Sequence, residues 1–390
     1  MKKILIVSNY FYPGFKAGGP IKSNFNLIDK LKGVFDFSVL TLDRDMGDME
    51  SYPQVQPDEW TNQNDATYFY ISPKKVNIKQ LRGLIKSNNP DLIYLNSLWN
   101  IKFSLKIVLL YKLGFFSTCK LLIAPRGELS FGALSLKASR KAISLFVLKL
   151  FNIYRDCFFH ATSIDEKYEI VNKLGVDAKN IFVASNIPTI EDATLPFNII
   201  KQQSPLKFVF LSRVSPKKNI KFAITVLSHF KDIDVVFDIF GPVDDKKYWQ
   251  ECLYEINRLP ANITVNYKHE IHPQDVAIRL SEYHAFLFPT LGENYGHVIV
   301  ESLLVGTPVL ISDLTPWHNI NELGLGLASP LNTPKNFFDE INNLLPALLS
   351  DSLEQRQSRI QVAKSLVGVD RAIKDSEKMF NQILNSMRRN

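Results

Sequence analysis

Residues 288–301 read FPTLGENYGHVIVE, and this stretch decides the fold. The apolar residues up to Phe288 predict a short buried strand, a loop containing Gly292 follows, and a helix is expected to begin near Gly296. The amide groups in the first turn of a helix lack partners within it and lie at the positive end of the helix dipole. The stretch therefore predicts a strand–loop–helix unit whose loop suits a phosphate group.

Two carboxylates flank this predicted phosphate site. Glu293 lies in the loop, and Glu301 lies about one and a half turns inside the helix. Carboxylates accept hydrogen bonds from sugar hydroxyls, so the pair is expected to face the two ends of a nucleotide-sugar. The mostly apolar residues 302–308 leave Glu301 little contact with solvent, whereas Glu293 taken alone is also typical of a hydrated loop.

Short apolar strands alternate with helical segments along the chain, which predicts parallel βαβ units. The 390 residues at roughly 150 per domain favour two domains, and the proline-rich stretch 187–206 is predicted to link them. We predict doubly wound α/β domains at 1–190 and 206–369, with a C-terminal helix of about 370–390 packing back on the first. Residues 43–66 receive no assignment. Strands are expected at residues 3–8, 37–42, 68–71, 92–95, 121–124, 157–161, 208–212, 235–241, 263–266, 285–289 and 308–312.

The composition excludes several classes of protein. Hydrophobic residues make up 46% and charged residues 22%, which excludes a disordered chain. Three scattered cysteines predict neither a disulfide framework nor a zinc site, and they fit a reducing cytoplasm. No apolar run is long enough to span a bilayer. The histidines lack metal-ligand spacing, and Asp43 and Asp45 are better explained as charged turn residues, so no metal is predicted.

Three further loops, each of which follows a predicted strand, could contact a ligand. Arg213 and Lys218 follow the strand at 208–212, where they could neutralise a diphosphate. Gly18 and Gly19 precede a helix and permit close approach of a ligand, although the spacing is not that of a dinucleotide-binding fingerprint. Arg126, in Pro125-Arg126-Gly127, could enter the same cleft.

Positive charge is concentrated in the first half of the chain. The net charge is +7, yet residues 1–190 hold 25 basic and 16 acidic residues, which is 25 − 16 = +9. Lys137, Arg140 and Lys141 form one predicted helix face, typical of either a membrane-surface helix or an ordinary amphipathic helix. This asymmetry indicates a negatively charged partner such as a lipid headgroup, or simply a solvated basic face.

With seven residues between them, Glu293 and Glu301 resemble the E-x7-E motif of retaining glycosyltransferases, particularly glycosyltransferase family 4. Residues 210–219 and 306–313 resemble further motifs of that family. The resemblance implies the GT-B fold, with two Rossmann-like domains facing a central cleft and no metal requirement. It implies that Glu301 binds the nucleotide ribose, that Arg213 and Lys218 hold the diphosphate, and that Glu293 contacts the donor sugar.

The same resemblance extends to neighbouring positions. Gly18 and Gly19 would let the first loop close over the diphosphate, and the donor-binding loop would include Asn294, Tyr295, Gly296, His297 and Val298. Many relatives have histidine where Arg126 stands, so Arg126 is assigned only to the cleft. His160 is either a cleft residue or a structural one.

Taken with these features, the resemblance implies a retaining, metal-independent hexosyltransferase that takes sugar from a nucleoside-diphosphate donor. The expected acceptor is a lipid-diphosphate-linked saccharide of a bacterial surface polysaccharide such as lipopolysaccharide, at the cytoplasmic face of the inner membrane. Two alternatives stay open: a non-catalytic nucleotide- or membrane-binding module of the same fold, and a nucleic-acid-binding protein. No aromatic and basic interleaving favours the latter, so no nucleic-acid partner is expected.

Overall fold

The computed structural model describes residues 1–63, 66–135, 145, 148–149, 151–189 and 205–386. Contacts within the chain divide it into two compact units. Unit 1 comprises Met1–Ile187 and Val369–Asn390, and unit 2 comprises Pro188–Gly368. The division falls close to the predicted boundary at residue 190, while most of the predicted linker lies outside the described residues.

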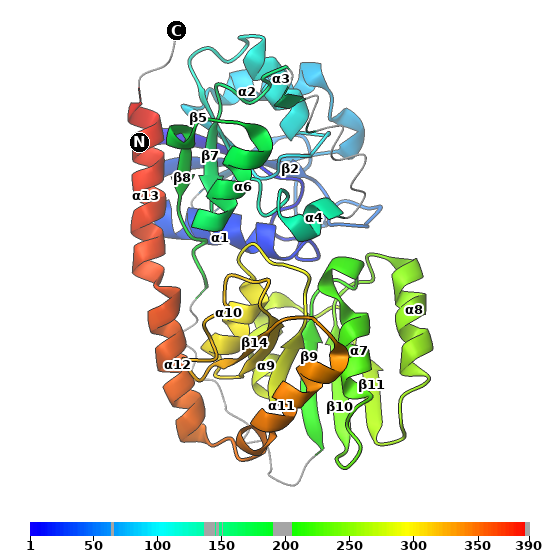
Figure 1. Cartoon of the computed structure of the whole chain (residues 1–390). Coiled ribbons are helices and arrows are strands. Elements are labelled where there is room, and N and C mark those ends of the chain that lie inside the picture. The colour runs from blue at the N-terminus through cyan, green and yellow to red at the C-terminus, as the bar shows by residue number, and fades with distance from the viewer. Residues whose placement is uncertain (64–65, 136–144, 146–147, 150, 190–204, 387–390) are drawn as a thin grey trace. The chain divides into compact units, whose positions relative to one another are not determined.

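Unit 1 is built on an eight-stranded sheet with the strand order β3-β4-β2-β1-β5-β6-β7-β8 (Figure 1). Every neighbouring pair is parallel except β3 and β4, which are antiparallel at one edge. The strands are β1 (Lys2–Val7), β2 (Phe35–Leu42), β3 (Trp60–Gln63), β4 (Ala66–Ile71), β5 (Leu92–Leu95), β6 (Lys120–Ile123), β7 (Phe158–Ala161) and β8 (Ile181–Val183).

Alternate side chains of the unit 1 strands enter two separate cores, one on each face of the sheet. Leu5 and Val7 of β1 pack with residues of α2, α3 and α6, whereas Ile4 and Ile6 pack with residues of α1 and α13. This alternation is expected for a sheet covered on both faces. The helices are α1 (Gly19–Leu31), α2 (Ile78–Asn88), α3 (Ser104–Lys112), α4 (Phe131–Ser135), α6 (Ile164–Leu174) and α13 (Val369–Asn385), with short 3-10 turns η1 (Pro73–Lys75) and η2 (Ala178–Asn180).

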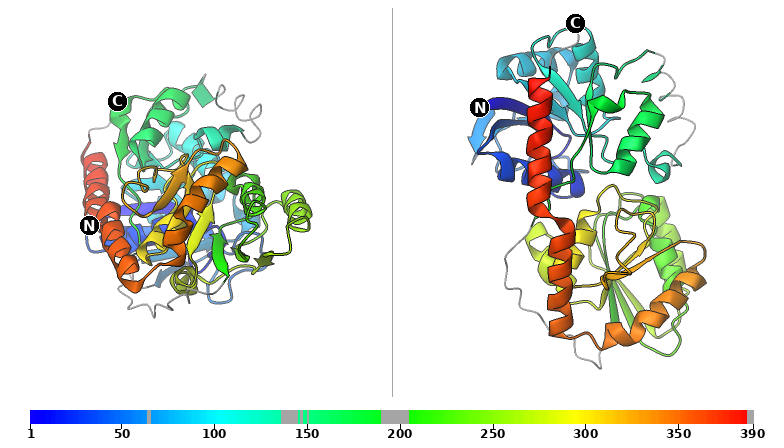
Figure 2. Two further views of the ribbon diagram at one scale, coloured as in Figure 1. Left: turned by 60° about the horizontal axis from the view of Figure 1, so that its bottom comes forward. Right: turned by 60° about the vertical axis from the view of Figure 1, so that its left-hand side comes forward.

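The last helix, α13, completes the core of unit 1. Phe380 is fully buried, and its ring centroid lies 5.4 Å from that of Phe35 and 5.8 Å from that of Tyr94. Met379 and Ile383 are buried in the same core. The right-hand view of Figure 2 shows this helix lying across the strands of the unit. The prediction that the C-terminal helix packs back on the first domain is therefore confirmed.

Unit 2 is a six-stranded, fully parallel sheet with the order β11-β10-β9-β12-β13-β14. Its strands are β9 (Leu206–Leu211), β10 (Val235–Phe240), β11 (Ile263–Tyr267), β12 (Ala285–Phe288), β13 (Val309–Ser312) and β14 (Gly326–Ser329). Its helices are α7 (Ile220–Leu227), α8 (Lys246–Ile256), α9 (Val276–Ser281), α10 (His297–Leu304), α11 (Pro334–Leu349) and α12 (Leu353–Val367), with 3-10 turns η3 (Pro216–Lys218) and η4 (Pro273–Asp275). No helix in the described part of the chain is both long and apolar enough to cross a membrane.

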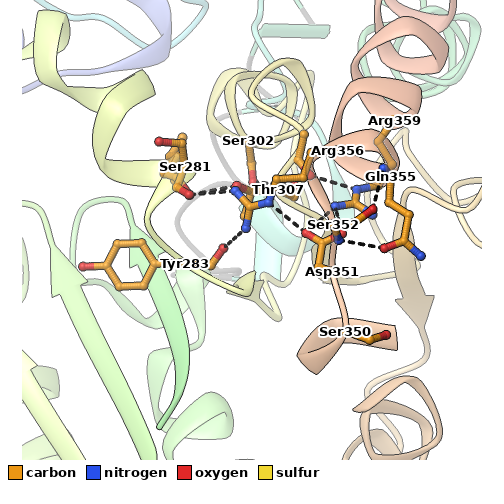
Figure 3. Close-up of polar contacts among 12 residues, drawn as sticks. Ser281, Tyr283, Ser302, Thr307, Ser350, Asp351, Ser352, Gln355, Arg356 and Arg359 are labelled. Atoms are coloured by element: carbon orange, nitrogen blue, oxygen red, sulfur yellow. Dashed lines mark hydrogen bonds and ion pairs between the residues drawn. The ribbon is translucent and has the colours of Figure 1, made fainter. Parts of the chain in front are cut away.

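A buried ionic network fastens α12 to the rest of unit 2 (Figure 3). The Arg356 guanidinium donates to Asp351 Oδ2 at 2.8 Å and to the carbonyl oxygens of Ser281 and Tyr283 at 2.7 and 2.9 Å. Arg359 donates to the Gly306 carbonyl oxygen at 2.8 Å, directly after α10. Because each arginine has several acceptors, the network holds the C-terminal end of α10 in place.

In both units, the order of strands reverses beside the first strand of the unit. The reversal falls between β1 and β5 in unit 1, and between β9 and β12 in unit 2. At such a point the loops after the two strands run in opposite directions and leave space at the carboxyl edge of the sheet, where open α/β sheets bind ligands. The topology thus points to the loops after β9 and β12.

Candidate functional site

The loops after β9 and β12 of unit 2 are joined by hydrogen bonds. The backbone N–H of Leu291, after β12, donates to the carbonyl oxygen of Lys217 at 2.9 Å. Thr290 Oγ1 lies 3.2 Å from the same oxygen, and Ser312, at the end of β13, donates to the Thr290 carbonyl oxygen at 2.5 Å. Three neighbouring strand ends therefore present one continuous, fixed edge.

Lys218 and Glu293 form an ion pair at this edge. Lys218 Nζ lies 2.5 Å from Glu293 Oε1, and Thr290 Oγ1 donates to the same oxygen at 3.0 Å. The side chains are 14% and 13% exposed, and the ammonium also lies 5.3 Å from the centroid of the Phe288 ring. The structure thus brings together two of the predicted site residues, one from each loop.

The ion pair keeps the Glu293 carboxyl ionised. Burial acts most strongly and raises the pKa, but the charges of Lys218 and Lys217 and the hydrogen bonds from Lys218 and Thr290 together hold the pKa of Glu293 below its usual value. A lysine ammonium has three N–H donors, so the pair retains capacity for a further acceptor.

The backbone around Lys218 is fixed by local geometry. Pro216 opens the 3-10 turn η3, and Asn219 ends it with a φ of 58°, a left-handed conformation that asparagine tolerates, before α7 begins. Gly241, after β10, has a φ of 128°, and a Cβ at this position would lie 2.1 Å from the Ser212 carbonyl oxygen. Glycine is therefore required where the loops after β9 and β10 meet.

Arg213 occupies the rim of the same edge. Its guanidinium lies 3.2 Å from Asp244 Oδ2, and the two side chains are 39% and 41% exposed. Sequence alone pairs Arg213 with Lys218 as two phosphate ligands, and it gives no sign of Asp244. In the structure each cation has a carboxylate partner from a different loop.

The helix predicted near Gly296 begins as expected, since α10 starts at His297 with Gly296 as its N-cap. The φ of Gly296 is 77°, which favours glycine. Tyr295 is buried between the His297 and Trp317 rings, at centroid distances of 4.9 and 5.7 Å. Trp317 Nε1 also donates to the Tyr295 carbonyl oxygen at 2.5 Å. Sequence reasoning missed Trp317, which supports this loop from after β13.

Glu301 lies near the buried tyrosine of this loop. Burial raises the pKa of Tyr295, and the nearby Glu301 charge raises it further. Asn294, Val298 and Glu301 are each partly exposed on the loop and α10. The predicted donor-binding residues after β12 thus belong to one loop–helix unit.

The two predicted glycines lie in unit 1. Gly18 is the N-cap of α1 with a φ of 70° and a ψ of −125°, and a Cβ there would meet nothing within 4 Å. The preceding loop is held by Asp45, whose carboxylate accepts from the N–H groups of Phe15 and Lys16 at 2.7 and 3.1 Å. Asp45 is buried, and its carboxylate is used to hold this loop.

Arg126 and His160 also lie in unit 1. Arg126 is partly exposed, whereas His160 is 2% exposed in the interior and contacts Tyr94 and the Ala184 carbonyl oxygen. The predicted basic residues Lys137, Arg140 and Lys141 lie outside the described residues. Within the described ranges, no three His, Cys, Asp or Glu side chains gather as a metal site requires.

Comparisons with known proteins bear on the family and the fold of the chain. Residues 192–365 match the family described as "Glycosyl transferases group 1". The O-antigen chain mannosyltransferase RfbU of Salmonella typhimurium is 24% identical over 213 residues, an alignment that covers 54% of this chain and 58% of that protein. The chain thus matches little more than half the length of this curated relative.

Solved structures resemble the whole chain. Sucrose-phosphate synthase from Thermosynechococcus elongatus superposes with a TM-score of 0.72 at 16% identity and covers 98% of this chain and 99% of that one. Anabaena HepE, solved in complex with UDP and glucose, has a TM-score of 0.68 at 16% identity, and the match covers 99% of this chain and 100% of that one. At these identities the likeness establishes the fold. The chain thus has the GT-B fold, and its residues 192–365 are similar in sequence to the glycosyl transferases group 1 family.

Proposed function

We propose that this protein is a glycosyltransferase that moves a sugar from a nucleoside-diphosphate donor to a saccharide acceptor. The observation that carries the proposal is the Lys218–Glu293 ion pair, held at the reversal of strand order in unit 2. A cation that would bind the diphosphate and a carboxylate that would bind sugar hydroxyls lie side by side there, before a helix N-terminus of the kind that suits phosphate.

The chemistry requires stabilisation of the leaving group. The bond from the anomeric carbon to the diphosphate oxygen breaks, the acceptor hydroxyl oxygen bonds to that carbon, and the hydroxyl proton passes to the departing diphosphate. Lys218 and Arg213 would neutralise the charge that develops there, and one such contact is typically worth about 2.7–4 kcal/mol. Glu301 would bind the nucleotide ribose, and Glu293 would orient the sugar.

The finer features of the reaction form part of the proposal. We infer retention of anomeric configuration by attack on the face from which the diphosphate leaves. We also infer no metal requirement, because two cationic side chains, Arg213 and Lys218, lie at this edge of the sheet. Product analysis by NMR would reveal an inverted anomer if the first inference fails. Loss of turnover in EDTA, restored by a divalent cation, would contradict the second.

The proposed acceptor is a lipid-diphosphate-linked saccharide of a bacterial surface polysaccharide, at the inner face of the cytoplasmic membrane. Two observations support it: the name of the Salmonella relative, an O-antigen chain mannosyltransferase, and the concentration of basic residues in 101–150. A basic face is attracted to anionic headgroups and to lipid-linked phosphate.

A donor panel tests the activity directly. UDP-, GDP-, dTDP- and ADP-sugars are incubated with the enzyme, and release of the nucleoside diphosphate is measured. With the accepted donor, we expect Arg213→Ala and Lys218→Met each to lower turnover at least about tenfold, since each removes a charged contact to the leaving group. Near-wild-type turnover in either variant would contradict the assignment of that residue.

The matched control is Arg279→Ala in the same unit. Arg279 forms an exposed ion pair with Glu282 at 3.1 Å, comparable to the pair between Arg213 and Asp244, but it lies on α9. Its removal is expected to leave turnover unchanged. A thermal-shift titration with wild type and Glu301→Gln completes the test. Nucleotide binding without turnover of any donor would favour a non-catalytic nucleotide-binding module.

A further inference from the structure

Arg126 of unit 1 has an unusual backbone conformation at the carboxyl end of β6. Its φ is 55° and that of Gly127 is 73°, so two successive residues are left-handed. A non-glycine residue in this region is uncommon, and such strain is concentrated at functional sites. The turn at Arg126 and Gly127 therefore adopts a backbone conformation that is unfavourable for a non-glycine residue.

Two carboxylates fix this turn from either side. Glu166, at the start of α6, accepts from the Gly127 N–H at 2.7 Å. Glu128 accepts from the Leu98 N–H at 2.6 Å and from Ser97 Oγ at 2.7 Å, which ties the loop after β6 to the loop after β5. Both carboxylates are thus used to hold backbone rather than to pair with Arg126.

Among the described residues, the hydrogen-bond partners of the Arg126 guanidinium are three neutral oxygens. Arg126 Nε donates to Asn96 Oδ1 at 2.7 Å, one terminal nitrogen donates to Tyr94 Oη at 2.8 Å, and the other donates to Asn186 Oδ1. No carboxylate in the described part of unit 1 forms an ion pair with it. A guanidinium carries five N–H groups, so two remain for another acceptor.

A hydrogen-bond chain behind Tyr94 sets the direction of its hydroxyl. His160 Nε2 lies 2.8 Å from the Ala184 carbonyl oxygen, which can only accept, so this nitrogen carries the proton. Nδ1, 2.6 Å from Tyr94 Oη, therefore accepts the tyrosine proton, and the lone pairs of Tyr94 face Arg126. Burial, and next the Arg126 charge, lower the pKa of His160 to about 3, so the imidazole stays neutral.

Asn96 supplies a second, independent sign of a ligand. Asn96 is 7% exposed, and its Oδ1 accepts from Arg126, whereas its buried Nδ2 has no hydrogen-bond partner among the residues that the structure describes. A buried donor without a partner is costly, and each such group in a native protein needs an explanation. The hydrogen bond between Arg126 Nε and Asn96 Oδ1 holds the Asn96 amide beside the Arg126 guanidinium. Both groups could therefore donate to the same acceptor.

We propose that Arg126 and Asn96 bind a phosphate-type oxyanion of a substrate, and that Tyr94 and His160 are positioning residues that orient the guanidinium. The identification of the oxyanion with a substrate rests on the proposed function; the anion site itself does not. The phosphate comes either from the nucleotide donor or from a phosphorylated acceptor. Planar, bidentate recognition of phosphate is the property that distinguishes arginine from lysine.

The test measures binding of inorganic pyrophosphate by calorimetry to the full chain carrying Lys218→Met, which removes the cation of the unit 2 pair. Addition of Arg126→Gln is expected to weaken binding about tenfold or more, the effect of losing charged hydrogen bonds. Asn96→Ala should weaken pyrophosphate binding as well, and Arg126→Lys should retain only part of the wild-type affinity at this position. Arg155→Gln, an exposed arginine of unit 1, is the matched control and should change nothing.

A double-mutant cycle separates positioning from a merely structural role. Tyr94→Phe should weaken pyrophosphate binding when Arg126 is present and have no effect when Arg126 is already glutamine. Equal effects in both backgrounds would overturn the role of Tyr94, and pyrophosphate affinity unchanged by Arg126→Gln would overturn the site. Neither result depends on donor turnover, so failure here is distinct from failure of the proposed function.

A competition arm identifies the source of the phosphate. Wild-type protein saturated with UDP or GDP is titrated with pyrophosphate. Displacement of the Arg126-dependent binding supports the donor as the source, and persistence of that binding supports a phosphorylated acceptor.

Discussion

At the residue scale, the Lys218–Glu293 pair combines two opposing effects. Transfer of either charge out of water is unfavourable, and the attraction between them offsets this only while both are present. The side chains are each less than one-sixth exposed, with Thr290 completing the set. Loss of one partner therefore differs physically from loss of both.

Unfolding in urea at pH 7 measures that difference. Lys218→Met and Glu293→Gln are each expected to lower the free energy of unfolding by about 1–3 kcal/mol, because each leaves a polar group without its partner. The double variant should lose less than the sum of the two single losses. Strictly additive losses would show that the two groups do not interact in solution.

Lys218 and Glu293 could be predicted as site residues because each lies in the loop that follows an apolar strand, and neighbouring parallel strands end at the same edge. The contacts made by Asp244 and Trp317 could not be predicted, since these residues come from loops after other strands and reach the site only in the folded chain. Arg126 was placed at a ligand-binding edge, but its hydrogen bonds to Tyr94 and Asn186 join residues up to sixty positions apart.

At the scale of elements, each of the strands predicted from apolar runs is present, with ends shifted by no more than two residues. The unpredicted strands β3, β8 and β14 are short. β3 is polar and lies at an edge, where one side faces no other strand. A polar edge strand such as β3 shows no alternation of apolar and polar residues, so its pairing depends on the neighbouring strand rather than on its own sequence.

The junction of the loops after β9 and β10 depends on a single glycine. Gly241→Ala places a Cβ 2.1 Å from the Ser212 carbonyl oxygen, which is backbone and cannot move aside cheaply. We expect a loss of at least about 2 kcal/mol in the free energy of unfolding, from steric overlap added to backbone strain.

Gly324→Ala is the matched control for Gly241→Ala. Gly324 has a φ of 65°, but a Cβ there meets nothing within 4 Å, so only the strain of a left-handed alanine applies. Urea unfolding of both variants should show the larger loss for Gly241. Equal losses would mean that the junction relaxes without cost.

At the scale of the whole molecule, two buried histidines make stability depend on pH. Burial lowers the pKa of His160 to about 3 and that of His284 to about 4, from an ordinary 6.5. Between those values and 6.5 the unfolded chain binds protons that the folded chain does not, so stability falls as the pH drops. Glu293, whose pKa is lowered, adds to the loss only below its unfolded value of 4.5.

We therefore expect the free energy of unfolding to decline from pH 7 to pH 5, by up to about 1.4 kcal/mol per pH unit for each histidine below 6.5. His160→Asn should make this decline shallower, because one of the protonating groups is gone. His318→Asn, which changes an exposed histidine, is the control and should leave the slope unchanged. If the free energy of unfolding of the wild-type protein stayed constant from pH 7 to pH 5, the lowered pKa values of His160 and His284 would be contradicted.

The uneven charge of the chain predicts salt-dependent membrane binding. Co-sedimentation with vesicles containing anionic lipid is expected at low salt and should weaken as salt rises, since screening shortens the range of attraction to about 10 Å at 0.1 M. Neutralising Lys137, Arg140 and Lys141 with glutamine should weaken it further. Vesicles of zwitterionic lipid serve as the control, and absence of binding to anionic vesicles at low salt would count against a membrane-surface role.

The helix α13 has a consequence for how the protein is made. Unit 2 is complete in sequence at Gly368, but unit 1 still lacks α13 when that residue leaves the ribosome. Until then, Phe35 and Phe37 of the nascent sheet remain without Phe380, their partner in the finished core. An uncovered apolar face of this kind is a binding surface for chaperones, and synthesis that stops before Val369 would leave it open permanently.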